Sequence, residues 1–229
     1  MRIRWIGQSG YAIQTEQAEI LIDPYLSDVV NRVAGRPRLV EAPIIPSEIC
    51  ADAVICTHDH LDHLDTDAIA EMNRGLCFIT TTEGKVKLRQ MGFERVQELH
   101  VGEKIVIEDV EVCAVYANHT VEAFGVPLIA EGKTLYFSGD TLYDERLFEL
   151  AEYQPDITFI CINGKLGNMN VDEAAVTAKN IGAKKNIPNH YGMFASNTEN
   201  PERFTSQIDN GFIMEFNQEY DIDWMLGNA

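Results

Sequence analysis

The order of strand-like and helix-like segments restricts the folds open to this chain more than any other feature. In both halves, short β-rich runs come first, and an alternation of strands with helices follows. In the first half we expect strands at residues 1–6, 11–14, 19–23, 51–58 and 76–81, and helices at 65–74 and 83–92. In the second half we expect strands at 103–109, 110–118 and 156–164, a hairpin at 126–141, a strand at 185–192, and helices at 143–153, 170–182 and 201–208. Two such halves predict an α/β (α+β) protein, a four-layer αββα sandwich with two sheets inside and helices outside.

Two segments fit this scheme less well. Residues 211–224 are mostly strand-like, and residues 23–43 form a long loop-like segment that contains Arg32, Arg36 and Arg38. Long loops in compact domains often close over a functional site. We therefore expect the three arginines to be either phosphate-binding residues or ordinary surface residues.

The size and charge of the chain limit its partners. The 229 residues are 45% hydrophobic, which suits one domain over residues 1–229. The net charge of −18 argues against nucleic acid or an anionic membrane bound by a basic surface. A small anionic substrate stays compatible, because a metal ion and a few cations can reverse the sign of charge within one cleft.

The cysteines and the N-terminal sequence indicate the compartment. The five cysteines are scattered and form no CxxC pair, so we expect reduced thiols and a cytoplasmic protein. The N-terminal residues show no signal peptide, and no apolar run approaches the length of a membrane span.

The segment THDHLDHLD, at residues 57–65, predicts a metal site. It holds three of the six histidines in the chain, interleaved with aspartates. His58 and His60 are two residues apart, which places both imidazoles on the same side of an extended segment. Asp62 and His63 follow closely, so the segment supplies one pair of ligands to each of two metal positions. Each position needs further ligands from elsewhere.

Three more candidate ligands follow apolar runs. His119, Asp140 and His190 each lie where a predicted strand enters a loop, and strand ends of a layered α/β protein converge on one edge. The carboxylate of Asp140 could bridge two ions. Asp23, in "LIDP", is either a turn former or a residue that orients a ligand histidine from behind.

These residues resemble the signature motifs of a known family. THDHLDHLD, His119, "FSGDT" (137–141) and His190 look like the motifs of the metallo-β-lactamase superfamily of metal-dependent hydrolases. The resemblance implies the αββα sandwich. It also implies a first metal bound by His58, His60 and His119, a second metal bound by Asp62, His63 and His190, and Asp140 between them.

A narrower resemblance concerns the last third of the chain. "NGKLGNMN" (163–170) and "IPNHYGMFASNTENPERF" (187–204) look like the branch that holds L-ascorbate-6-phosphate lactonase. This implies one or two Zn²⁺ or Mn²⁺ ions per chain. It also implies hydrolysis of a small, phosphorylated lactone or ester by a metal-activated water. Asp62 would then be either the proton acceptor or a ligand only.

Other functions and contacts stay open at this point. A phosphodiesterase and a non-catalytic metal-binding or sensing protein are the rival functions, and a homo-oligomer is compatible with either. The loop 163–170 either presents N–H groups to an anion or is a plain turn capped by Asn170. The expected substrate contacts are Asn163, Lys165, Asn168 and Tyr191.

Overall fold

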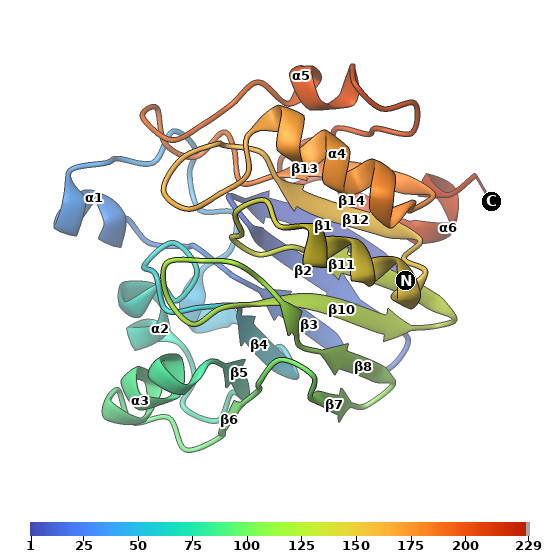
Figure 1. The fold of residues 1–229 in the computed structure, drawn as a ribbon. Helices are drawn as coiled ribbons and strands as arrows, with labels where there is room; N and C mark the ends of the chain where they lie inside the picture. The colour runs from blue at the N-terminus through green and yellow to red at the C-terminus, as the bar shows by residue number, and fades with distance from the viewer. Residues whose placement is uncertain (228–229) are drawn as a thin grey trace.

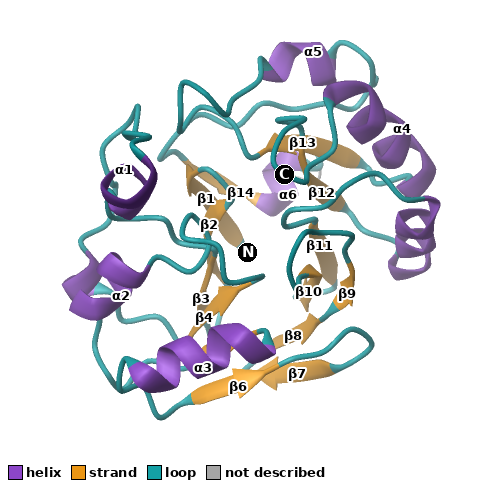
Figure 2. Ribbon diagram, turned by 60° about the vertical axis from the view of Figure 1, so that its left-hand side comes forward, coloured by secondary structure: helices purple, strands orange, loops and turns teal. Residues whose placement is uncertain are grey.

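The computed structural model describes residues 1–227 and consists of two β-sheets packed face to face, with helices on the outside (Figures 1 and 2). The first sheet has the order β14-β1-β2-β3-β4-β5-β6. Its strands β1 to β3 form an antiparallel meander, and β3 to β6 pair in parallel. The strand bounds are β1 Arg2–Gly7, β2 Gly10–Gln14, β3 Glu19–Ile22, β4 Ala53–Cys56, β5 Phe78–Thr80, β6 Val96–Glu98 and β14 Glu219–Asp221.

The second sheet repeats this plan in the order β13-β12-β11-β10-β8-β7, with β9 paired to β10. Strands β7, β8, β10 and β11 are antiparallel, whereas β11, β12 and β13 pair in parallel. The bounds are β7 Lys104–Ile107, β8 Val110–Cys113, β9 Val115–Tyr116, β10 Phe124–Ala130, β11 Lys133–Phe137, β12 Ile157–Cys161 and β13 Lys185–Asn189. The predicted repeat of a meander followed by strand–helix alternation is therefore confirmed.

Helices cover the outer faces of both sheets. On the first sheet lie α2 (Thr66–Glu71) and α3 (Thr82–Gln90), and on the second lie η2 (Glu145–Tyr153), α4 (Val171–Ile181) and α5 (Pro201–Thr205). Helix α1 (Val29–Ala34) lies apart from the sheets and packs against Met193 and Phe194, in the loop after β13 (Figure 1). Short helices η1 (Pro46–Glu48) and α6 (Ile222–Met225) complete the described chain. None of the helices in residues 1–227 has the length and apolar character that crossing a membrane requires.

Two apolar cores hold the layers together. The larger lies between the sheets and includes Ile55 and Phe159, whereas a second packs Val54 and Ile69 between the first sheet and its helices. Because β4 sends alternate side chains to opposite faces, its neighbouring residues Val54 and Ile55 join different cores. The αββα sandwich is thus confirmed.

Several element predictions were wrong in detail. Residues 211–224 are mostly loop and hold only β14 and part of α6 as regular elements; the aromatic side chains there pack on one another, as Phe212 does on Tyr220 and Trp224, without a strand ladder. The loop 23–43 contains α1, and the helix at 143–153 is a 3₁₀ helix. The strand predicted at 110–118 divides into β8 and β9, and the three-residue strand β6 was not predicted.

Candidate metal centre

The seven predicted ligands gather in two adjacent groups at one edge of the sandwich. They follow β4, β9, β11 and β13, as expected for loops that leave the ends of strands. Within each group the ligand atoms lie within 4.8 Å of one another. The first group is His58, His60, His119 and Asp140, and the second is Asp62, His63 and His190.

Three imidazole nitrogens converge in the first group. Nδ1 of His60 lies 3.0 Å from Nε2 of His58 and 3.2 Å from Nε2 of His119. The opposite nitrogens of the two partners are already engaged: Nδ1 of His119 lies 3.1 Å from the carbonyl oxygen of Gly167, and Nδ1 of His58 lies 3.1 Å from Oγ1 of Thr57.

These outer contacts fix the tautomers of both rings. A carbonyl oxygen only accepts, so Nδ1 of His119 donates to Gly167. The Thr57 hydroxyl gives its one hydrogen to Asp23, so it accepts from Nδ1 of His58. Both Nε2 atoms therefore present lone pairs toward the same point, which is the arrangement that a bound cation satisfies.

Asp140 lies between the two groups. Its Oδ1 is 3.3 Å from Nε2 of His63 and 3.2 Å from Nε2 of His190, and its Oδ2 is 3.9 Å from Nε2 of His119. Oδ1 of Asp140 and Nε2 of His63 are buried and form no hydrogen bond within residues 1–227. Such groups are costly to bury unsatisfied, so the residues present fit a metal ion, which Asp140 would help to hold together with the histidines of either group.

A buried carboxylate orients His63 from behind. Oδ2 of Asp23 lies 2.7 Å from Nδ1 of His63, which directs Nε2 of that ring toward the centre. Asp23 also accepts hydrogen bonds from the backbone N–H and the hydroxyl of Thr57, at 2.7 and 2.8 Å. Of the two roles expected for Asp23, the contact that orients His63 is therefore observed, and metal binding by His63 stays a prediction.

Gln8 is a site residue that the sequence did not reveal. Its side chain is buried, and Nε2 donates to Oδ2 of Asp62 at 2.8 Å and lies 3.1 Å from Nε2 of His190. The only local signal is the tight turn between β1 and β2, in which Gly7 and Gln8 both have positive φ values, of 101° and 52°. The contact with Asp62 joins residues 54 positions apart, so only the fold creates it.

The charges of the two groups differ. Burial, reinforced by the neighbouring His63, lowers the pKa of His58 well below its usual value. Burial also pulls the pKa of His190 down, but Asp140 and Asp62 outweigh it and raise that pKa to about 9. Burial raises the pKa of Asp140, yet His190 and His63 hold it well below its usual range. A metal ion must therefore displace a proton from the second group.

The other aspartates of the motif serve structural roles. Oδ2 of Asp59 pairs with Nζ of Lys87 at 2.6 Å. Asp65 caps α2 by accepting a hydrogen bond from the N–H of Ala68. Of the three aspartates at positions 59, 62 and 65, only Asp62 joins the ligand groups.

A pocket of about 500 Å³ opens beside the ligands. Its wall includes the apolar side chains of Val30, Leu61 and Leu166, and Arg36 is its one arginine or lysine among the described residues. The remaining lining residues are His60, Asp62, Thr120, Asp140, Gly167, His190 and Asn197.

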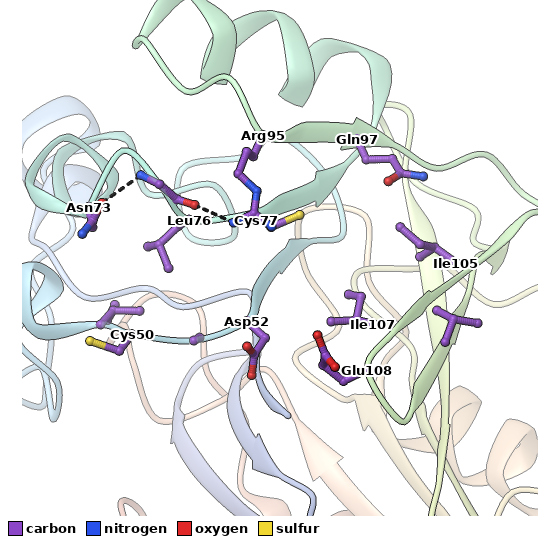
Figure 3. A pocket seen from close by; sticks show the side chains of 14 residues that line it. Cys50, Asp52, Asn73, Leu76, Cys77, Arg95, Gln97, Ile105, Ile107 and Glu108 are labelled. Atoms are coloured by element: carbon purple, nitrogen blue, oxygen red, sulfur yellow. Dashed lines mark hydrogen bonds between the residues drawn. The ribbon is translucent and has the colours of Figure 1, made fainter. Parts of the chain in front are cut away.

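A second hollow, of about 590 Å³, lies at the opposite edge of the first sheet (Figure 3). It is lined by residues that precede β4 and β5, among them Asp52 and Cys77, and by Ile105 and Ile107 of β7. It contains none of the seven ligands. We therefore expect metal-dependent chemistry in the first pocket, which candidate metal ligands line, and not in this hollow.

The predicted substrate contacts lie around the pocket beside the ligands but do not line it. Nδ2 of Asn168 donates to Oδ1 of Asn163 at 3.0 Å, and Nζ of Lys165 donates to the carbonyl oxygen of Ser196 at 3.1 Å. The ring of Tyr191 packs on Trp5, with centroids 4.8 Å apart. Direct contact of these side chains with a substrate stays a prediction. Asn170 caps α4 in a capping box, as the plain-turn interpretation expects.

The three arginines of the long loop differ in their contacts. Arg32 forms an exposed ion pair with Asp67, and Arg38 donates to backbone carbonyl oxygens of its own loop. Arg36 is half-buried in the pocket wall, and its guanidinium forms no hydrogen bond or ion pair within residues 1–227. Arg36 is therefore the one arginine of the three that is placed to meet an anion in the pocket.

Two His/Asp donor groups that share a carboxylate, at the edge of an αββα sandwich, define a metal-binding protein of the metallo-β-lactamase fold. Comparison with known proteins agrees. Residues 18–191 match the family described as Beta-lactamase superfamily domain. A UPF0173 metal-dependent hydrolase of Methanopyrus kandleri is 30% identical, over 91% of this chain and 92% of that protein.

Solved structures show the same fold. A metallo hydrolase from the hyperthermophilic archaeon Ignicoccus hospitalis matches with a TM-score of 0.81 and 21% identity, over 96% of this chain and 97% of that one. An isothiocyanate hydrolase from Delia radicum gut bacteria matches with a TM-score of 0.81 and 19% identity, over 96% and 99%. The chain belongs to the β-lactamase superfamily and, within it, to the UPF0173 metal-dependent hydrolases.

Proposed function

We propose that this protein hydrolyses a small ester or lactone that carries a phosphate or another anionic group, with one or two Zn²⁺ or Mn²⁺ ions at the centre. The observation that supports this most is the pocket itself, which is lined both by Arg36 and by four of the candidate ligands, His60, Asp62, Asp140 and His190. When bound, a divalent metal supplies a Lewis acid and lowers the pKa of a bound water to about 7.

Residues of the chain would accept the proton, orient the acceptor and bind the substrate. Asp62 lines the pocket, and its side chain is 18% exposed, so it can take the proton that an attacking water releases. Gln8 holds Oδ2 of Asp62, which keeps the carboxylate facing His190. The guanidinium of Arg36 binds the anionic group, and Val30 and Leu61 exclude water from around the substrate.

The test is turnover of L-ascorbate 6-phosphate by metal-stripped protein that has been reloaded with Mn²⁺ or Zn²⁺ separately. We expect ring opening that requires metal and disappears in His60→Ala. Arg36→Ala should raise KM more than it lowers kcat, because its contact forms in the ground state as well as the transition state. His100→Ala is the matched control, since His100 is exposed and lies outside both ligand groups.

Two results would redirect the assignment. A protein that binds metal stoichiometrically but does not open the ring would contradict the lactone and ester proposal. Hydrolysis of bis(4-nitrophenyl) phosphate by the same preparation would then favour a phosphodiesterase. No turnover of either compound would favour a metal-binding protein without catalysis.

A further inference from the structure

One lining residue of the pocket, Asn197, presents an unpaired hydrogen-bond donor. Its side chain is only 4% exposed, and its Oδ1 accepts a hydrogen bond of 2.8 Å from Nδ2 of Asn163. Its own Nδ2 forms no hydrogen bond with another residue of the range 1–227, and this atom is not fully buried. A donor in this position is available to a molecule in the pocket.

The orientation of this amide is fixed by a chain of three asparagines. An Asn163 atom lies 3.2 Å from the carbonyl oxygen of Lys165, and because that oxygen only accepts, the atom must be the Nδ2 amide. The second hydrogen of Nδ2 points to Asn197, so the facing atom of Asn197 must be Oδ1. The remaining oxygen of Asn163 accepts from Nδ2 of Asn168.

One backbone carbonyl thus sets the direction of all three amides. The acceptor left over at one end is Oδ1 of Asn168, which is buried without a partner. The donor left over at the other end is Nδ2 of Asn197, a residue that lines the pocket. The opposite direction would place an oxygen of Asn163 against the Lys165 carbonyl and an oxygen of Asn197 in the pocket.

The backbone of Asn197 is also held in place. Its N–H donates to the carbonyl oxygen of Phe194 at 3.0 Å, and the two residues form an antiparallel bridge. The side chain therefore starts from a fixed point, and its single polar anchor leaves Nδ2 with little freedom. Groups that are positioned before binding lose less entropy when the ligand arrives.

We propose that Nδ2 of Asn197 binds an anionic oxygen of the substrate, with Asn163 as the positioning residue that directs it. The inference rests on the proposed function, because it places the substrate in this pocket. Together with Arg36, which lines the same pocket, it supplies donor groups that select carboxylate or phosphate groups.

The test is calorimetric titration of the zinc-loaded protein with inorganic phosphate. Asn197→Asp keeps the size of the side chain and the acceptor for Asn163, but it replaces the donor with a negative oxygen. We expect Kd to rise by about tenfold or more, and by about threefold to tenfold in Asn197→Ala, which loses the donor and the acceptor for Asn163 but adds no negative charge.

The matched control is Asn170→Asp, which makes the same change of charge in a neighbouring loop. Asn170 is exposed, and its Oδ1 remains as the acceptor that caps α4, so phosphate affinity should stay within about twofold of the wild-type value. Equal affinities of the Asn197→Asp and Asn170→Asp proteins would overturn the proposal. So would a wild-type protein that binds no phosphate at millimolar concentration.

The positioning role of Asn163 has its own test. Asn163→Leu should weaken phosphate binding in the wild-type background but not in Asn197→Ala, because the donor it directs is then absent. A purely structural role would weaken binding in both backgrounds. Phosphate binding does not require turnover, so the binding experiments can be interpreted even if the protein hydrolyses no ester or lactone.

Discussion

Side chains of one type have different roles in this protein, and their contacts decide which role each one takes. Asp23 and Asp62 both lie within 4 Å of His63, but Asp23 contacts the nitrogen that faces away from the centre and Asp62 the nitrogen that faces it. Asp23 is fully buried, whereas the side chain of Asp62 is 18% exposed in the pocket wall. Of these two aspartates, only Asp62 can therefore contact both a metal and a substrate.

Asp62→Asn tests whether this carboxylate is a proton acceptor or only a ligand. The amide keeps an oxygen for a metal and for Gln8 but accepts no proton at neutral pH. We expect turnover to fall by about 10² to 10⁴, with a much smaller loss of bound metal measured by elemental analysis. Parallel losses of metal and turnover would show that Asp62 is only a ligand.

Gly167 controls His119 through direct contact. Its φ is +92°, and a Cβ at this position would lie 2.9 Å from both Cε1 and Nδ1 of His119. We expect Gly167→Ala to push the ring from its place and to weaken zinc binding by about 10-fold to 100-fold, the effect typical of losing an outer contact of a ligand histidine.

Gly182→Ala is the control for Gly167→Ala. Gly182 also has a positive φ, of 76°, but a Cβ there would meet nothing within 4 Å. Both variants should lose about 1–2 kcal/mol of unfolding free energy in urea through the left-handed backbone, whereas only Gly167→Ala should lose zinc affinity. An equal loss of zinc affinity in the two variants would mean that backbone strain, and not the contact with His119, weakens zinc binding.

At the scale of elements, strand ends bring together ligands that lie far apart in the sequence. His119, Asp140 and His190 could be predicted because each follows an apolar run, a signal that is local. Gln8 and Asn197 could not, because their roles depend on hydrogen bonds to residues 54 and 34 positions away. Strand β6 was missed for a related reason: its three residues carry no alternation, and pairing with β5 defines it.

The start of α4 gives an element-scale prediction. Oδ1 of Asn170 accepts from the N–H groups of Asp172 and Glu173, and Glu173 returns a hydrogen bond to the N–H of Asn170. Asn170→Ala should lower the unfolding free energy in urea by about 1 kcal/mol, and Asn170→Ser should restore most of it. Equal stability of the alanine and serine variants would mean that the cap adds nothing measurable to this helix.

At the scale of the whole molecule, net charge and local charge oppose each other. The chain carries a net charge of −18, which repels an anion at long range. Selection of the anionic substrate that we propose would therefore have to come from short-range groups: a bound metal, Arg36 and the donor on Asn197. The same acidic surface favours the approach of divalent cations to a site whose own residues are imidazoles and carboxylates.

Metal binding is expected to depend on pH across the whole physiological range. With no metal bound, Asp140 and Asp62 overcome the effect of burial and raise the pKa of His190 to about 9, so its ring is protonated at neutral pH. Only the neutral imidazole offers a lone pair, so zinc must displace that proton. Zinc affinity should therefore rise with pH up to about 9, by at most tenfold per pH unit for this proton.

Calorimetry in buffers of different ionisation enthalpy measures the protons released when zinc binds at pH 7. We expect at least one, and we expect His100→Ala, which alters a histidine outside both ligand groups, to leave the number unchanged. Because zinc binds only the folded chain strongly, a hundredfold excess over Kd should add about 2.7 kcal/mol to the unfolding free energy. This gain should shrink as the pH falls from 8 to 6, since protons then compete for His190 in the folded state. Zinc binding without proton release would mean that the ring is already neutral, and that the carboxylates do not hold its proton as the structure indicates.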